Sequence, residues 1–530
     1  MVNAMKCVSR RSFLAVPAVL AAAPPSRPRV ALVRSTHPKL EQPATADHPL
    51  DYPRVREMVW KAIEYAGGLE GKIRPGCWVV IKPNLGHLRG RPAYRPGDVT
   101  DWRVTQAALE YVARRSRARR VTVAEGGSYR GLHDPATDNV PMQNGVRVDA
   151  ATCDWGDDYP GFRGTLAGLL ADFRARFPDK QFDYVDLSYD AVRDAAGAFR
   201  RLEVPRARNG VGAFGARPDY FVANTILNCG FLINVPVMKI HAVCGLTACF
   251  KNYVGTAPRQ CYAPPGVFSN FLLHQQHQVE GRLDPFITDL ASFHPPDFNV
   301  VDGIRGLQYQ EHNNRRPDQM LQNNLVLAGA DTVAVDALVG HIMGFNVWDL
   351  DFLHLAVQRE MGEMDLSRVQ LQGDDPAPVR QRWGRPRGWH GRCNRTWRVS
   401  RDPASEMRTW TRHTTRGDTL DFVAWSGASP APETVYAAGV GVRSDGAGKA
   451  VLWMGVSGRV TVSLNGEQVL VEENLTRYRV GQFQKPVELR AGENQLIFRV
   501  EPREGQARLS ALLADPRNDG DSVEGIRWGV

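Results

Sequence analysis

Apolar runs alternate with amphipathic segments through the first two thirds of the chain. Residues 30–33, 78–81 and 121–124 are almost continuous apolar runs, as in strands that are buried on both faces of a sheet. Between them, residues 55–66 and 104–112 carry apolar side chains at the spacing of a helix. Strands that alternate with helices predict an α/β domain, in which helices flank a mostly parallel sheet.

The pattern changes in the last third of the chain. Residues 376–397 are rich in Arg, Trp, Gly and Pro, which predicts a linker or another irregular segment. Beyond it, apolar and polar side chains alternate over 460–464, and Asn465-Gly466 supplies a hairpin turn. This alternation predicts an antiparallel, jelly-roll-like β-sandwich. The expected organisation is a leader over 1–28, an α/β domain over 29–364, a linker over 365–399 and a β-sandwich over 400–530.

The first residues follow the order of a twin-arginine export signal. Arg10 and Arg11 precede Phe13 and a short apolar run over 15–23, whose last alanines suit a signal peptidase. The run is too short to cross a bilayer, and no other segment of the sequence reaches the required length. We therefore expect an exported protein, periplasmic or secreted, whose mature chain has no membrane span.

Composition narrows the classes of partner. A chain of 530 residues exceeds one ordinary core, and 43% hydrophobic with 23% charged residues is typical of a globular protein. The net charge of +9 comes mainly from Arg scattered along the sequence, which favours a solvated surface over a nucleic-acid interface. We expect a small-molecule ligand and no nucleic acid.

The cysteines limit the cofactors. There are eight Cys, of which Cys7 lies in the leader, and no two form a Cys-x-x-Cys pair. This spacing argues against a zinc ribbon and against an iron–sulfur cluster. The odd number left in the mature chain means that at least one thiol has no internal disulfide partner. The cofactor is unknown from the sequence, and a metal ion stays a candidate.

Polar segments follow three of the apolar runs. They are residues 82–85, 125–127 and 234–241, each directly after a run that predicts a strand. Because functional side chains in such sheets gather at the carboxyl ends of the strands, we expect these segments to share one edge of the sheet.

The order of these motifs resembles the family known as domain of unknown function 362, over roughly residues 30–345. That family has a Lys-Pro-Asn after a strand, a Pro-x-x-Lys-x-His segment, a Gly-Leu-Thr, a Lys-Asn, an Asp-Gly and an Asp-x-x-Ala-x-Asp helix start. Members often carry a ferredoxin-like cluster domain, but this chain lacks the cysteines for one. The matching residues are 82–84, 236–241, 245–247, 251–252, 302–303 and 331–336.

This constellation suits an anionic ligand. Three lysines and an imidazole on one rim would bind a carboxylate or phosphate, and a Lys with a lowered pKa or His241 would transfer a proton. Carboxylates would complete an acid/base or metal set. The candidates are Lys82, Glu125, Lys239 and His241 for catalysis, Asn84, Thr247, Lys251 and Asn252 for ligand binding, and Asp302 and Asp336 for a metal.

The same residues also have alternative interpretations, in which their roles are purely structural. Lys82 would pair with Asp302 or Asp336, Asn84 would cap a turn, and Asp331 would be the N-cap of the next helix. His274 and His277 would form half of a metal site, although a solvated helix face is favoured because no third ligand is evident.

The sandwich resembles the galactose-binding-like modules that are attached to many carbohydrate-active enzymes, over roughly residues 400–515. The resemblance implies a carbohydrate as a second possible partner, bound by exposed aromatic side chains. Packing of the same aromatic residues in the core is the favoured interpretation. The aromatic candidates are Trp410, Trp425, Trp453 and Tyr478.

Taken together, these patterns favour an exported enzyme that acts on an anionic or polyhydroxylated compound by proton transfer or metal-assisted chemistry. The alternative is a non-catalytic protein that binds a ligand or a carbohydrate. Gly126-Gly127 follows a predicted strand but does not continue into a Gly-x-Gly-x-x-Gly, and no Walker or Gly-x-Ser-x-Gly motif is found, so NAD, ATP and serine-hydrolase chemistry are not expected.

Overall fold

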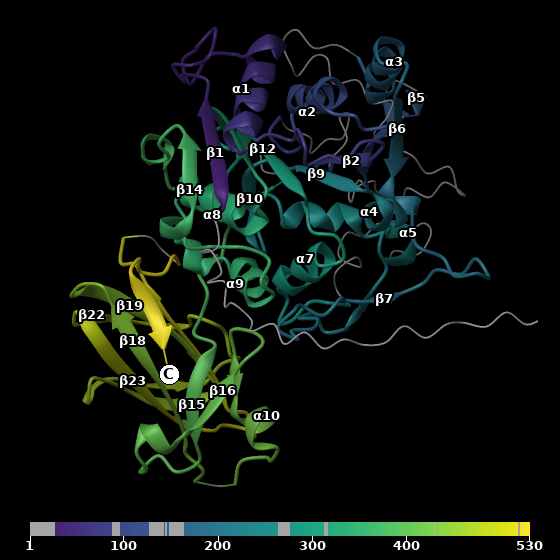
Figure 1. Ribbon diagram of the computed structural model, residues 1–530. Helices are drawn as coiled ribbons and strands as arrows, with labels where there is room; N and C mark the ends of the chain where they lie inside the picture. The colour runs from purple at the N-terminus through teal and green to yellow at the C-terminus, as the bar shows by residue number, and fades with distance from the viewer. Residues whose placement is uncertain are drawn as a thin grey trace, which may run out of the picture.

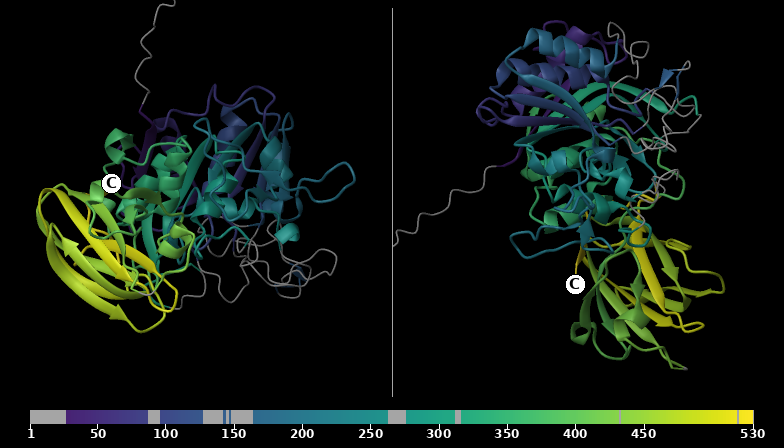
Figure 2. Two further views of the ribbon diagram at one scale, coloured as in Figure 1. Left: turned by 90° about the horizontal axis from the view of Figure 1, so that it is seen from below. Right: turned by 90° about the vertical axis from the view of Figure 1, so that its right-hand side faces the viewer.

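The computed structural model describes residues 27–86, 96–126, 142–143, 146–147, 164–262, 276–311, 316–431, 433–517 and 520–529. All but the last two residues of the expected leader lie outside these ranges. The described part forms an α/β body with a β-sandwich at one end (Figure 1, Figure 2). None of the helices described combines the length and apolar character that crossing a membrane requires.

The α/β body is built on one eight-stranded sheet. Most neighbouring strands are parallel, as predicted, but β13 runs antiparallel to both β1 and β12. The edge strand β14 lies within residues 365–399, which were expected to be a linker. Its backbone pairs with β1, so this part of the stretch belongs to the sheet. In spatial order the strands are β14 (Gln370–Gly373), β1 (Arg29–Arg34), β13 (Met320–Gly329), β12 (Phe298–Leu307), β9 (Phe231–Val235), β2 (Trp78–Pro83), β3 (Arg120–Glu125) and β6 (Gln181–Asp186).

Helices cover both faces of this sheet (Figure 1). Successive residues of a strand point to opposite faces, so Ala31 and Val33 of β1 join one core while Val30 and Leu32 join the other. Asp51 caps the first helix by accepting the N–H of Arg54. The first core includes α1 (Tyr52–Tyr65), α2 (Trp102–Arg115) and α3 (Leu166–Arg176), and the second α4 (Asn224–Asn228), α5 (Arg259–Tyr262), α7 (Asp284–Ala291), α8 (Thr332–Ile342) and α9 (Asp351–Gln358).

Short elements cover the carboxyl ends of the central strands. The hairpin of β10 (Lys239–His241) and β11 (Gly245–Thr247) follows β9 and leads to the 3₁₀-helix η3 (Lys251–Thr256). A bridge between Val237 and Asp302 fastens the start of this hairpin to β12. The remaining short strands of the body are β4 (Met142–Gln143), β5 (Val146–Arg147), β7 (Leu202–Glu203) and β8 (Asp219–Tyr220).

The C-terminal part is an antiparallel β-sandwich, as the alternating pattern predicts. Its core lies between the two sheets, and Asn465 and Gly466 form the predicted turn with φ of 52° and 88°. One sheet contains β16 (Thr411–Thr414), β15 (Thr396–Ser400), β18 (Tyr436–Ser444), β23 (Gly492–Glu501), β20 (Gly458–Leu464), β21 (Glu467–Asn474) and β25 (Ile526–Gly529). The other contains β17 (Leu420–Asp421), β24 (Arg508–Ala514), β19 (Gly448–Val456) and β22 (Phe483–Leu489), and the short helix α10 is Phe422–Ser426.

Charged side chains connect the sandwich to the α/β body. Asp351 of α9 accepts from Arg392 at 2.7 Å and pairs with Arg395 at 2.9 Å, and Arg395 also pairs with Asp418 at 3.1 Å. Arg282 completes the group between Asp284, at 3.3 Å, and Asp418, at 3.9 Å. We call this group the seam network; its members are Arg282, Asp284, Asp351, Arg392, Arg395 and Asp418.

Candidate functional site

The carboxyl ends of β2 and β3 bring Lys82 and Glu125 together. The Lys82 ammonium lies 3.0 Å from Glu125 Oε2 and donates to Asn252 Oδ1 at 3.1 Å. This Lys82 pair is buried, and burial lowers the pKa of Lys82 against the opposing effect of Glu125. Lys82 was expected to pair with Asp302 or Asp336 if its role were structural; its partner is Glu125, because β2 and β3 are adjacent parallel strands.

The Lys82 pair is saturated with hydrogen bonds and covered. Glu125 accepts the backbone N–H groups of Leu85 and Gly126, and Asn252 donates to Asn234 at 2.7 Å. Gly255 of η3 lies directly against the pair: a Cβ at that position would overlap the Glu125 carboxylate and lie 2.7 Å from Lys82 Nζ. The pair therefore holds η3 against the sheet, and it does not face open space.

A second polar cluster lies on the β10–β11 hairpin. Lys239 donates to Asp98 Oδ1 at 2.7 Å and pairs with Glu311 Oε2 at 3.2 Å, while His241 Nε2 lies 2.8 Å from Glu311 Oε1. We call Asp98, Lys239, His241 and Glu311 the Glu311 cluster. Sequence reasoning found the two cations but missed both carboxylates, which lie outside the predicted helices and strands and belong to no motif.

The hydrogen bonds of His241 fix its protonation. Its Nδ1 accepts the backbone N–H groups of Val243 and Cys244, at 3.1 and 3.2 Å, so the ring proton is on Nε2 and is donated to Glu311. Burial lowers the pKa of His241 to about 4, although Glu311 opposes this shift. Burial also works against the charge of Lys239, but Asp98 and Glu311 raise its pKa above the ordinary value. At neutral pH the cluster contains a charged Lys239 and a neutral His241.

Lys251 lies at the start of η3 between the two groups. It is half-buried, and within the described part of the chain no hydrogen bond or ion pair reaches its ammonium group. Its charge disfavours the protonated forms of both Lys82 and His241, so it acts on both groups. Thr247 lies opposite Lys239 in the hairpin register, and its buried Oγ1 has no hydrogen-bond partner among the described residues. The structure therefore leaves one cation and one hydroxyl unmatched here.

The side chains of three other predicted site residues, Asn84, Asp302 and Asp336, accept hydrogen bonds from backbone N–H groups. Asn84 Oδ1 accepts the N–H of Gly86, so this side chain caps a turn, as its structural role would require. Asp302 accepts the N–H groups of Asp101 and Ile304, and burial with the nearby Asp101 carboxylate raises the pKa of Asp302 to about 7.

Asp336 has a similar backbone role. Its carboxylate accepts the N–H groups of Cys249 and Phe250, and burial raises its pKa to about 6. In the described ranges, neither Asp302 nor Asp336 belongs to a group of three potential metal ligands. Asp331 is the N-cap of α8, as predicted.

The remaining histidine and aromatic candidates lie in packed surroundings. His277 is buried with its ring stacked on Tyr220 at 3.8 Å between centroids, so the expectation of a solvated helix face was wrong for this residue; His274 is outside the described residues. Trp410 is buried and donates its Nε1 to Ser405. The other three sandwich candidates, Trp425, Trp453 and Tyr478, are partly buried.

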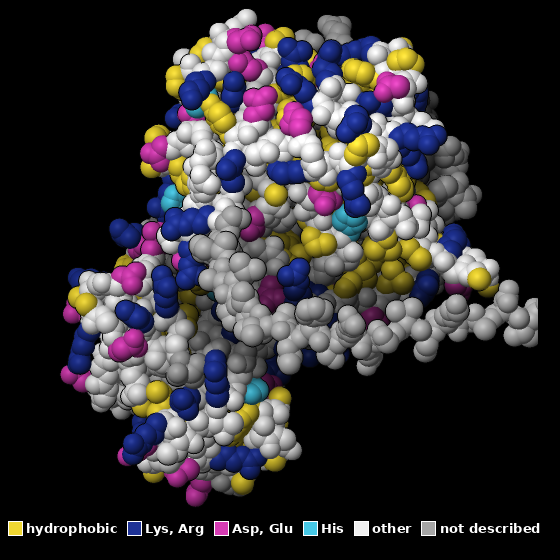
Figure 3. Space-filling view, viewed as in Figure 1, with side chains coloured by type: hydrophobic (Ala, Val, Ile, Leu, Met, Phe, Trp, Pro, Cys, Tyr) yellow, Lys and Arg dark blue, Asp and Glu magenta, His cyan; other side chains and the backbone are white. Residues whose placement is uncertain are grey.

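The visible surface has no single field of charge. Figure 3 shows Lys and Arg side chains scattered between Asp and Glu over the face that it presents. This distribution agrees with a solvated basic surface.

Comparisons with known proteins match part of the chain. The model of the family described as Domain of unknown function (DUF362) matches residues 194–340, which include the hairpin, η3 and Glu311. The resemblance predicted from the motifs is therefore confirmed over this range. No curated protein matches the sequence.

Several solved structures are similar to parts of this chain. The lactate racemase apoprotein from Thermoanaerobacterium thermosaccharolyticum is 13% identical, covering 57% of this chain and 54% of its own, with a TM-score of 0.24. A family 35 carbohydrate-binding module from an environmental isolate is 15% identical over 27% of this chain and 93% of its own, with a TM-score of 0.15. A β-glucosidase from Kluyveromyces marxianus in complex with glucose is 13% identical over 23% of this chain and 16% of its own, with a TM-score of 0.18. The chain thus spans about a sixth of that enzyme's length, and TM-scores this low say nothing about chemistry.

Proposed function

Taking the match of residues 194–340 to DUF362 as the premise, we propose that the protein is an enzyme that binds a small anionic, hydroxylated compound beside the Glu311 cluster and moves a proton on it. The observation that carries this proposal is the unmatched Lys251 ammonium group next to a cluster whose other charges are paired.

Lys251 and Thr247 provide the binding groups. A half-buried cation without a carboxylate partner attracts an anion more strongly than a solvated surface lysine does, because less water screens it. The Thr247 hydroxyl is buried and unsatisfied among the described residues, so a ligand oxygen there would remove the cost of leaving it without a hydrogen bond. A carboxylate of the compound would pair with Lys251, and one of its carboxylate or hydroxyl oxygens would accept from Thr247.

Glu311 provides the proton acceptor. Its side chain is 18% exposed, which is more than that of any other member of the cluster. Lys239 and the neutral His241 hold its two oxygens, so they are positioning residues. An O–H bond forms at Glu311 as a C–H bond next to the bound carboxylate breaks, and the electron pair stays on the compound as an enolate near Lys251. The proton then returns to the same compound, so the step needs no co-reactant.

This assignment gives positioning roles to all four residues that were predicted to act in catalysis. Lys82 and Glu125 were predicted to act in catalysis, but their pair is saturated and lies beneath Gly255. We assign the Lys82 pair and Asn252 to positioning η3, and through it Lys251.

A non-catalytic binding protein is the second candidate. The closed Lys82 pair favours it, since a site that only binds needs the Lys251 and Thr247 donors and no proton acceptor. In this alternative the sandwich contributes a carbohydrate site, with the partly buried Trp425, Trp453 and Tyr478 as its aromatic side chains. Titration of the protein with neutral oligosaccharides tests that second ligand class separately.

We also propose export by the twin-arginine route, on the basis of Arg10, Arg11 and the apolar run that follows. Replacing both arginines by lysine should leave the protein in the cytoplasm, as fractionation and immunoblotting would show. Unchanged export of that variant would contradict the route.

The enzyme proposal is tested by hydrogen exchange with solvent. The protein is incubated in deuterium oxide with tartrate, malate, gluconate and glucuronate, and mass spectrometry measures deuterium at carbon. We expect exchange with at least one compound, and its loss in Glu311→Gln with ligand binding retained. Binding without exchange in the wild-type protein would favour the second candidate. Exchange at the wild-type rate in Glu311→Gln would contradict the role of Glu311.

A further inference from the structure

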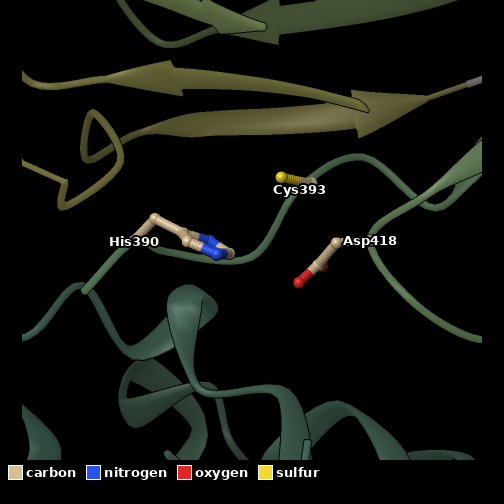
Figure 4. A group of neighbouring side chains, drawn as sticks. All are labelled: His390, Cys393 and Asp418. Atoms are coloured by element: carbon tan, nitrogen blue, oxygen red, sulfur yellow. The ribbon is translucent and has the colours of Figure 1, made fainter. Parts of the chain in front are cut away.

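Three potential metal ligands converge where the linker meets the sandwich. His390 and Cys393 lie just before β15, and Asp418 lies just before β17. One ligand atom of each lies within 4.8 Å of the others, and the three side chains point toward one another in Figure 4. We propose that His390, Cys393 and Asp418 bind a divalent transition metal ion, of which Zn²⁺ is the best fit.

The hydrogen bond of His390 prepares one ring nitrogen for a metal. Its Nδ1 lies 2.9 Å from the carbonyl oxygen of Gly391. Because a carbonyl oxygen only accepts, Nδ1 must carry the ring proton, and Nε2 keeps its lone pair. Donation of the second ring N–H to a backbone carbonyl is the usual arrangement of a histidine that binds a metal.

Cys393 supplies a sulfur with no competing bond. It is a free thiol, fully buried against Leu512 and Ala514. In the described part of the structure its Sγ makes no hydrogen bond and no disulfide. A thiolate in this position selects a soft or borderline cation and disfavours Mg²⁺ and Ca²⁺.

Asp418 completes the set without giving up its place in the seam network. Its Oδ1 accepts from Arg395 at 3.1 Å, whereas Oδ2 lies 3.9 Å from Arg282, beyond hydrogen-bond distance. A carboxylate has about four lone-pair sites, so the ion pair with Arg395 leaves room for one bond to a metal.

The charge around the cluster admits a divalent ion. The seam network contains three guanidinium groups and three carboxylates, and the carboxylate of Glu280 lies against Gly417, next to Asp418. Binding of a divalent ion releases the thiol proton to solvent, so the local charge rises by one unit. The Glu280 carboxylate balances this increase.

Sulfur, nitrogen and oxygen ligands in one set are typical of Zn²⁺, and three protein ligands leave a fourth position for water. The ion would join the linker, through His390 and Cys393, to the sandwich, through Asp418, beside the ion pairs that reach α9. The expected role is to stabilise the seam, independently of the proposed reaction.

The test uses the full chain loaded with Zn²⁺ or with Co²⁺, after dialysis against metal-free buffer. Elemental analysis counts bound zinc, and the cobalt form reports a thiolate ligand through a near-ultraviolet charge-transfer band. The variants are Cys393→Ser and His390→Gln. Cys229→Ser is the matched control, because Cys229 Sγ lies 3.9 Å from His294 Nδ1 in the other Cys–His contact of the described structure.

We expect one zinc ion per wild-type chain, at least tenfold weaker zinc binding in Cys393→Ser and in His390→Gln, and no cobalt–thiolate band in Cys393→Ser. Cys229→Ser should bind as the wild type does. His390→Gln retains the thiol, so it decides the outcome if Cys393→Ser fails to fold. A wild-type chain that retains no zinc, wild-type affinity in His390→Gln, or loss of the cobalt band in Cys229→Ser would each overturn the proposal.

Discussion

Two buried polar regions of this molecule handle charge in opposite ways. In the seam network, guanidinium groups and carboxylates alternate, and each carboxylate has an arginine partner. Beside the hairpin, lysine and a neutral histidine hold Glu311, while Lys251 has no partner among the described residues. In the seam network every charged group has a partner of opposite charge, whereas beside the hairpin Lys251 contacts no carboxylate among the described residues.

The difference separates a structural group from a candidate site. The planar fork of arginine suits fixed pairs with carboxylates, and a complete set of pairs holds two domains together without needing a ligand. Lysine and neutral histidine form more adaptable contacts, and a half-buried cation without a carboxylate partner is available to an anionic ligand. Charged groups that have shifted pKa values or no partner of opposite charge are typical of functional sites.

The largest effect is expected from breaking the seam network at its centre. Asp351→Asn removes the partner of Arg392 and Arg395, so the free energy of unfolding should fall by about 3–5 kcal/mol. Denaturant unfolding measures the change. Asp172→Asn, which removes an exposed pair with Arg176, is the control and should cost less than about 1 kcal/mol. Equal effects of the two variants would show that the seam is no more than a surface contact.

His241 should give the protein a measurable sensitivity to acid. Its pKa is about 4 in the folded state against 6.5 ordinarily, so the unfolded chain binds a proton first as pH falls. The stability that neutral His241 contributes is complete above pH 6.5 and is lost as pH falls to about 4, by up to about 3 kcal/mol. His241→Gln should flatten this part of the curve of unfolding free energy against pH. An unchanged slope would mean that the ring is not buried in its neutral form.

A substitution at Gly255 tests whether η3 covers the pair of Lys82 and Glu125 as closely as the structure shows. An added Cβ overlaps Glu125, so Gly255→Ala should lower the free energy of unfolding by about 1–3 kcal/mol and displace η3. Gly446→Ala is the control, because a Cβ there meets nothing within 4 Å. Unaltered stability in Gly255→Ala would reopen a catalytic role for Lys82.

Much of the fold was predictable because it depends on local pattern. The apolar runs at 30–33, 78–81 and 121–124 form β1, β2 and β3, and Asp331 caps α8 as predicted. The antiparallel β13 and the edge strand β14 were not foreseen, since strand order is decided by packing between distant segments.

The site was predictable only in part. Lys82, Lys239, His241 and Lys251 lie near one edge, as the position of their segments after predicted strands implied. Their anionic partners were harder to assign, because Asp98 is 141 positions from Lys239 along the chain and belongs to no motif. The same is true of the seam network, in which Arg392 and Arg395 reach Asp351 only when the two domains meet.

The central claim is that Lys251 binds the anionic group of a ligand. Two measurements on Lys251→Met, one of ligand affinity and one of stability, test it together. Calorimetric titration measures affinity for the tightest-binding hydroxy-carboxylate, and denaturant unfolding measures stability in the absence of ligand. Lys449→Met, on β19, serves as the control for a lost lysine. The account predicts at least tenfold weaker binding in Lys251→Met, with a free energy of unfolding within about 0.5 kcal/mol of the wild type. Unchanged affinity, or a loss of stability as large as that expected for Asp351→Asn, would contradict it.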